Sequence, residues 1–126
     1  MSDASRPWIL VVDDDEDIRD SISSLLQLRG YSVDTAADGA DGLERMRSGA
    51  PPALVILDFM MPRMNGEEFR AAQLRDPALA AIPVVLLTGA GEGAVAGRVP
   101  VERIAKPIDL QLLFDTVARF CPLSRV

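Results

Sequence analysis

Three short apolar runs, without alternating polar positions, stand out along the chain. They cover residues 8–12, 53–57 and 82–87. A strand of a parallel sheet is covered on both faces and shows this continuous apolar pattern. A strand with one solvent-exposed face instead alternates apolar and polar residues. The three runs therefore predict the central strands of a parallel sheet.

The segments between these runs predict the rest of an α/β fold. Residues 31–36 alternate more and predict a less buried strand, and residues 101–105 can supply a fifth. Apolar residues at helical spacing predict helices over residues 18–29, around 43–46 and over 110–120. Turn residues at 62–66, followed by two glutamates whose charge suits a helix start, predict another helix over residues 67–75. Four glycines and a proline between residues 88 and 106 leave room for at most a short helix there.

Side chains that carry chemistry follow the predicted central strands. Asp13 and Asp14 come directly after the first run, Asp58 after the second and Thr88 after the third. Parallel strands all point the same way, so these residues share the carboxyl edge of the sheet, where open α/β sheets bind ligands. The pattern predicts a site at this edge.

Three carboxylates in one place need a counter-charge. At a separation of about 5 Å, each pair repels by roughly 3 kcal/mol at an effective dielectric near 20. A hard divalent cation relieves this repulsion, and an all-carboxylate set suits Mg²⁺ better than zinc. We therefore expect Asp13, Asp14 and Asp58 to bind Mg²⁺, while the remaining acids at residues 15–17 need only solvate a helix start.

Two other motif interpretations fail. Asp13, Asp15 and Asp17 have the spacing of the first ligands of an EF-hand, but Ile18 stands where that loop needs glycine. Residues 91–96 match a loose dinucleotide fingerprint, yet they follow the fourth strand along the chain. The first strand–helix turn, where that fingerprint belongs, is acidic and would repel a pyrophosphate.

Composition narrows the functional class. The length of 126 residues is that of one domain, so we expect a single domain over residues 1–126 with its core at about 8–120. A net charge of −6 argues against direct nucleic-acid binding.

The absence of histidine excludes histidine triads and histidine metal sites. Cys121 is the only cysteine, which excludes an internal disulfide, and we expect it to be a buried residue at a helix end. With no membrane-length apolar stretch and no signal-like start, we expect a cytoplasmic protein without membrane insertion.

Four motifs occur in a characteristic order: residues 11–14, residues 57–66, residues 86–89 and the Lys106-Pro107 pair, which contains the only lysine. With them the chain resembles a response-regulator receiver domain of two-component signalling, of the stand-alone type, from residue 8 to about residue 120. The resemblance implies a flavodoxin-like, doubly wound five-stranded parallel sheet of order 2-1-3-4-5, here with a shortened or irregular fourth helix.

The resemblance also implies roles. Asp58 would be the nucleophile that takes a phosphoryl group from the phosphohistidine of a sensor histidine kinase or a histidine phosphotransfer protein. Asp14 and Asp58 would bind Mg²⁺ directly, together with the backbone carbonyl of Met60, and Asp13 would act through water. Such a domain promotes only its own phosphorylation and dephosphorylation, so an enzyme acting on a separate substrate is not expected.

Two further residues would complete the implied site. Thr88 would donate its hydroxyl to a phosphoryl oxygen, and Lys106 would pair first with Asp58 and then with the phosphate. Pro107 would follow a cis peptide, as is typical of this family.

The chain departs from the family pattern on its output side. Arg103 stands where an aromatic switch residue is usual, and an arginine cannot bury its charge as a ring buries its face. Our hypothesis is that residues 89–103, including Gly89 and Ala90, are mobile without phosphate and become ordered on phosphorylation or partner binding. A fixed glycine-rich loop is the alternative. Because Met60 and Ala90 have no acid or amide to orient an attacking water, we also expect slow self-dephosphorylation.

The leading functional prediction is a phosphoacceptor switch that signals through an unknown downstream protein or relays its phosphate. The alternative is a pseudo-receiver, an interaction module that keeps the fold without being phosphorylated. An aspartate-nucleophile phosphatase is disfavoured, because Met60 occupies the place of its second aspartate.

Overall fold

One parallel sheet organises the chain, with its strands in the order β2-β1-β3-β4-β5. The computed structural model describes residues 7–122 except residues 98 and 100. The strands are β1 (Trp8–Val12), β2 (Ser32–Ala36), β3 (Leu54–Asp58), β4 (Val84–Thr88) and β5 (Glu102–Ala105). The helical segments are α1 (Glu16–Leu28), α2 (Gly39–Arg47), α3 (Gly66–Leu74), α4 (Gly93–Ala96) and α5 (Leu110–Phe120). This is the predicted flavodoxin-like, doubly wound architecture.

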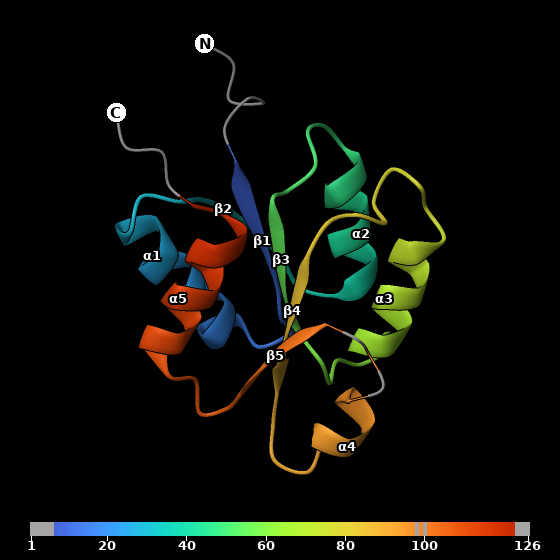
Figure 1. Cartoon of the computed structure of the whole chain (residues 1–126). Coiled ribbons are helices and arrows are strands. Elements are labelled where there is room, and N and C mark those ends of the chain that lie inside the picture. The colour runs from blue at the N-terminus through green and yellow to red at the C-terminus, as the bar shows by residue number, and fades with distance from the viewer. Residues whose placement is uncertain (1–6, 98, 100, 123–126) are drawn as a thin grey trace.

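Helices cover both faces of the sheet. In Figure 1, α1 and α5 lie on one side of the strands, and α2 and α3 lie on the other. Successive side chains of a strand point to opposite faces, so β1 contributes Leu10 and Val12 to the core under α2 and α3. It contributes Ile9 and Val11 to the core under α1 and α5. Burial on both faces explains why the central strands are apolar throughout.

The helix ends follow from local sequence. Asp15 caps α1 by accepting hydrogen bonds from the backbone N–H groups of Asp17 and Ile18, and Gly30 beyond its end has a positive φ of 99°. Asn65 begins α3 with a capping box that is completed by Glu68. Asp109 caps α5, and Cys121 is buried at the other end of that helix, as predicted for this cysteine.

The prediction for the fourth strand was wrong at its start. The strand begins at Val84, because the N–H of Ile82 bonds to the Leu79 carbonyl and the Ile82 carbonyl accepts from Gln73 Nε2. Ile82 is therefore part of a turn, although its side chain is buried. The short helix expected before the fifth strand is present as α4, with four residues.

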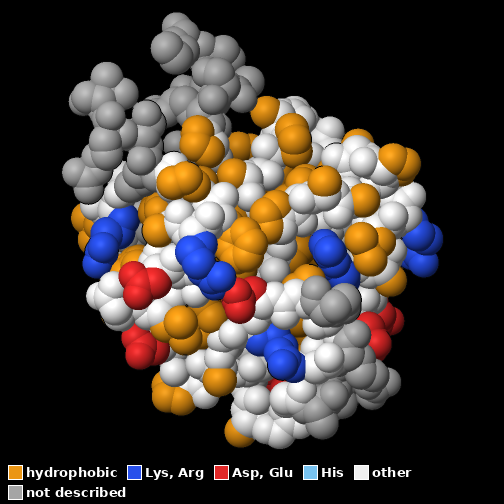
Figure 2. Space-filling view, viewed as in Figure 1, with side chains coloured by type: hydrophobic (Ala, Val, Ile, Leu, Met, Phe, Trp, Pro, Cys, Tyr) orange, Lys and Arg blue, Asp and Glu red, His pale blue; other side chains and the backbone are white. Residues whose placement is uncertain are grey.

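The described part of the chain contains no helix long and apolar enough to cross a membrane. Figure 2 shows basic, acidic and apolar side chains interspersed over one face of the molecule. The basic side chains visible on that face do not merge into one broad patch, which is consistent with the acidic net charge.

Candidate functional site

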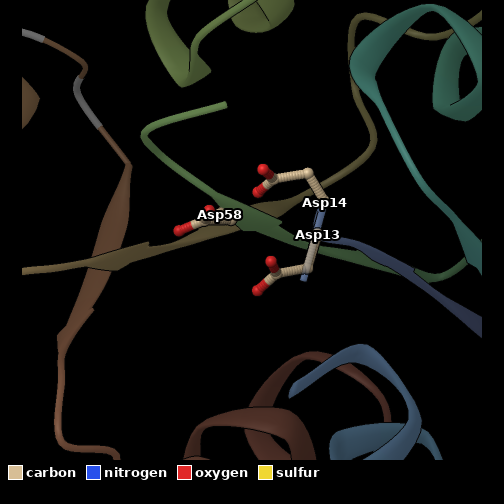
Figure 3. A group of neighbouring side chains, drawn as sticks. All are labelled: Asp13, Asp14 and Asp58. Atoms are coloured by element: carbon tan, nitrogen blue, oxygen red, sulfur yellow. The ribbon is translucent and has the colours of Figure 1, made fainter. Parts of the chain in front are cut away.

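Three aspartates meet at the carboxyl edge of the sheet. Asp13 and Asp14 directly follow β1, and Asp58 is the last residue of β3. The parallel register pairs Val12 with Leu57, which brings both strand ends level. One carboxylate oxygen from each aspartate lies within 4.8 Å of the others, and within residues 7–122 no other such group of acids or cysteines occurs. Figure 3 shows the three carboxylates directed to the same side, past the strand ends.

The turn after β1 holds Asp13 in place. Its Oδ1 accepts a hydrogen bond from the Asp15 backbone N–H at 2.9 Å, and its carbonyl accepts one from Arg19 Nη1 at 2.8 Å. The residue is fully buried, yet its Oδ2 has no hydrogen-bond partner. A buried carboxylate oxygen without a partner is costly in free energy, so this atom is available to bind a ligand. Sequence analysis missed Arg19, whose only signal is its position one turn into α1.

Lys106, which directly follows β5, adds a positive charge to the acidic site. Its Nζ donates a hydrogen bond to Asp58 Oδ1 at 3.0 Å, and its backbone N–H bonds to the Thr88 carbonyl at 2.7 Å. Thr88 is buried at the end of β4, opposite Ala105. The Lys106–Pro107 peptide is cis, as the family pattern implied. The structure thus brings Asp13, Asp14, Asp58, Thr88 and Lys106 to one edge, as predicted.

Burial and charge shift the pKa values within the site. Burial raises the pKa of Asp58 to about 6; the hydrogen bond from Lys106 opposes this rise, and the charge of Asp13 adds to it. Burial also raises the pKa of Asp13, against the hydrogen bond from Asp15. Burial lowers the pKa of Lys106, but its hydrogen bond with Asp58 and the charges of Asp58, Asp13 and Glu92 raise it on balance. The site therefore favours added positive charge.

Three of the four residues expected to act in switching are exposed. Met60 is exposed two residues after Asp58, Gly89 is half-buried, and Ala90 is exposed. Arg103 is also exposed, and its Nη1 donates to the Gly93 carbonyl at 3.4 Å. A phenylalanine at position 103 would have no donor for that bond. Whether residues 89–103 order on phosphorylation stays a prediction, and residues 98 and 100 of this segment lie outside the described residues.

Comparison with known proteins decides the family. The family model of the response regulator receiver domain matches residues 9–118. The chain belongs to this family. The receiver is similar to a solved response regulator receiver protein of Pseudomonas putida, with a TM-score of 0.83 and 25% identity over 91% of this chain and 98% of that one. It is also similar to the chemotaxis response regulator CheY4 of Vibrio cholerae, with a TM-score of 0.81 and 31% identity over 92% and 99% of the two chains.

Curated relatives are longer proteins. The response regulator MprA of Mycobacterium avium is 46% identical over 80 residues, which are 64% of this receiver and 34% of MprA. The DNA-binding dual master transcriptional regulator RpaA of Synechocystis is 38% identical over 86 residues, or 68% of this receiver and 35% of RpaA. The receiver therefore spans about a third of the length of these relatives, and the single-domain organisation of residues 1–126 stays a prediction.

Proposed function

We propose that this receiver is a phosphoacceptor switch in which Asp58 accepts a phosphoryl group from the phosphohistidine of a sensor histidine kinase or a histidine phosphotransfer protein. The observation that carries the proposal is the environment of Asp58: a buried carboxylate with a raised pKa, bonded to the only lysine of the chain and flanked by two further aspartates. A buried carboxylate with a specific cationic partner at a ligand-binding edge is typical of a reactive group.

The chemistry follows from this environment. A carboxylate oxygen of Asp58 attacks the phosphorus, a P–O bond forms, and the P–N bond to the donor imidazole breaks, which leaves the donor as a neutral histidine once it has its proton. With a pKa of about 6, Asp58 is mostly ionised at pH 7 and so is competent as a nucleophile. Lys106 Nζ, 3.0 Å from Asp58 Oδ1, can move with the transferred charge to a phosphoryl oxygen, and the Thr88 hydroxyl can donate to another.

The residues present fit a magnesium ion. Asp13 offers a buried oxygen without a partner, Asp14 is exposed so that water can share the site, and all donors are oxygens. Asp14, Asp58 and the Met60 carbonyl would hold the ion directly and Asp13 through water. When bound, Mg²⁺ supplies positive charge that offsets the carboxylates and the phosphoryl oxygens.

The output that we propose is contact with a downstream protein, or relay of the phosphate to a further histidine. The net charge of −6 disfavours direct contact of this domain with nucleic acid, whatever the full-length relatives bind.

The proposal is tested by the intact mass of the protein after incubation with acetyl phosphate. We expect the gain of one phosphoryl group in wild type and in the control Asp20→Asn, which removes an exposed carboxylate of α1. We expect no gain in Asp58→Ala or without Mg²⁺. If neither acetyl phosphate nor a phosphohistidine donor modifies the wild-type protein, the proposal is wrong and the pseudo-receiver alternative is favoured.

A further inference from the structure

The segment after β4 is held by a carboxylate that is not part of the aspartate site. Glu92 turns back so that its Oε1 accepts a hydrogen bond from the backbone N–H of Gly89 at 2.6 Å. Its Oε2 lies 3.3 Å from the place that a Cβ would occupy at residue 89, a tighter approach than most real Cβ atoms show. Because glycine has no Cβ, the Glu92 carboxylate can pack directly against the backbone of residue 89. Sequence analysis missed Glu92, although it is the only acid between residues 89 and 101.

The amide that Glu92 occupies belongs to the edge where the phosphoryl group would form. Gly89 directly follows Thr88, and the neighbouring strand ends at Asp58, whose successor Phe59 bonds through its N–H to the Leu87 carbonyl at 2.9 Å. A backbone N–H at such an edge is a donor suited to an anion. The charge of Glu92 also helps to raise the pKa of Lys106, after the larger contributions of Asp58 and Asp13.

We propose that Glu92 is an internal anion that occupies the Gly89 amide in the unphosphorylated receiver and is displaced when Asp58 carries a phosphoryl group. This inference rests on the proposed function of Asp58. An aspartyl phosphate brings almost two negative charges and oxygens that accept strong hydrogen bonds. It therefore competes with Glu92 for the Gly89 amide, and it repels the Glu92 carboxylate.

Displacement of Glu92 would change the protein surface at α4. The Glu92 carbonyl accepts a hydrogen bond from the Ala96 N–H at 2.8 Å, so Glu92 makes the first hydrogen bond of this four-residue helix. Arg103 Nη1 donates a hydrogen bond to the carbonyl of Gly93, the first residue of α4. A change at Glu92 therefore alters the first turn of α4 and its contact with Arg103, which stands where the family usually has the aromatic switch residue. In this receiver the Glu92 carboxylate acts as the switch in place of that aromatic residue.

The test measures the binding of beryllofluoride, a phosphoryl mimic, in the presence of Mg²⁺. Glu92→Gln keeps a hydrogen-bond acceptor and removes the charge, whereas Glu92→Ala removes both. Glu44→Gln is the control, because it removes an exposed charge from α2. We expect both Glu92 variants to bind beryllofluoride roughly 3- to 10-fold more tightly than wild type, the size expected from the loss of one competing like charge. The Glu44 variant should bind like wild type.

A second readout reports on Gly89 directly. In the unliganded wild type its amide proton should exchange slowly with solvent, and in Glu92→Ala it should exchange faster. Adding beryllofluoride should give the Gly89 amide the same NMR shift in both proteins, because the same anion then occupies it.

The outcomes separate the two proposals. If wild type binds beryllofluoride and the Glu92 variants bind no more tightly, Glu92 only supports the turn; its displacement is refuted while the role of Asp58 stands. If neither wild type nor any variant binds the mimic or accepts phosphate, the role of Asp58 fails and the inference about Glu92 fails with it.

Discussion

Replacing Asp58 by asparagine should stabilise the metal-free receiver at neutral and higher pH. The buried carboxylate has a pKa of about 6 in the folded protein against an ordinary value of 3.8, a rise of about two units. Because one unit corresponds to roughly 1.4 kcal/mol, the ionised Asp58 costs the folded state about 3 kcal/mol above pH 7. Asparagine has nearly the same shape and removes that cost. Lys106 loses its partner in the variant, but its side chain is 28% exposed and can be hydrated, so we expect a net gain of about 1–3 kcal/mol.

The sign of the pH dependence follows from linkage. Between about pH 4 and pH 6 the folded state binds more protons at Asp58 than the unfolded state does, so the contribution of Asp58 to the stability of wild type falls as the pH rises through this window. The advantage of Asp58→Asn should therefore be small near pH 4, grow between pH 4 and 6, and level off above pH 7.

Urea unfolding in EDTA at several pH values measures this difference, with Asp20→Asn as the matched control for the loss of one acidic charge. The control should show no comparable growth in stability between pH 4 and 6. A difference between Asp58→Asn and wild type that does not change with pH, or a variant that is less stable than wild type at pH 8, would refute the reasoning about burial.

Three further predictions concern the metal, the start of α3 and the phosphoryl lifetime. Asp13→Asn should weaken Mg²⁺ binding, measured by calorimetry, by about tenfold or more, because in the proposed site Asp13 would support the ion through water; an unchanged affinity would contradict this role. Gly66→Ala should cost about 1–3 kcal/mol in urea unfolding, because its Cβ would lie 2.9 Å from both Leu86 Cδ2 and Phe59 Cδ1, whereas Gly93→Ala, which meets open space, should cost little. Met60→Asn should shorten the lifetime of the aspartyl phosphate, followed by intact mass, and an equal lifetime would show that this exposed position does not control the attacking water.

The central strands and the acidic edge could be predicted because their causes are local in sequence. Burial on both faces gives β1 and β3 their continuous apolar runs, and parallel pairing then places Asp13, Asp14 and Asp58 together. The exact start of β4 could not be predicted, because it depends on a hydrogen bond from Gln73, nine residues away along the chain.

The contacts around α4 could not be predicted from the sequence for a different reason. The bond from the Gly89 amide to Glu92 and the bond from Arg103 to Gly93 each depend on the path that a glycine-rich segment takes after β4. Glycine permits many backbone conformations, so composition limits the length of the helix without fixing the path of the chain.

The central claim is that Asp58, among three neighbouring aspartates, takes the phosphoryl group. Reduction of the acetyl phosphate-treated protein with borohydride converts an aspartyl phosphate into homoserine, which peptide mass spectrometry can locate. The account predicts homoserine at residue 58 alone, and only when Mg²⁺ was present during phosphorylation. Homoserine at residue 13 or 14, or none in a protein whose mass shows phosphorylation, would contradict it.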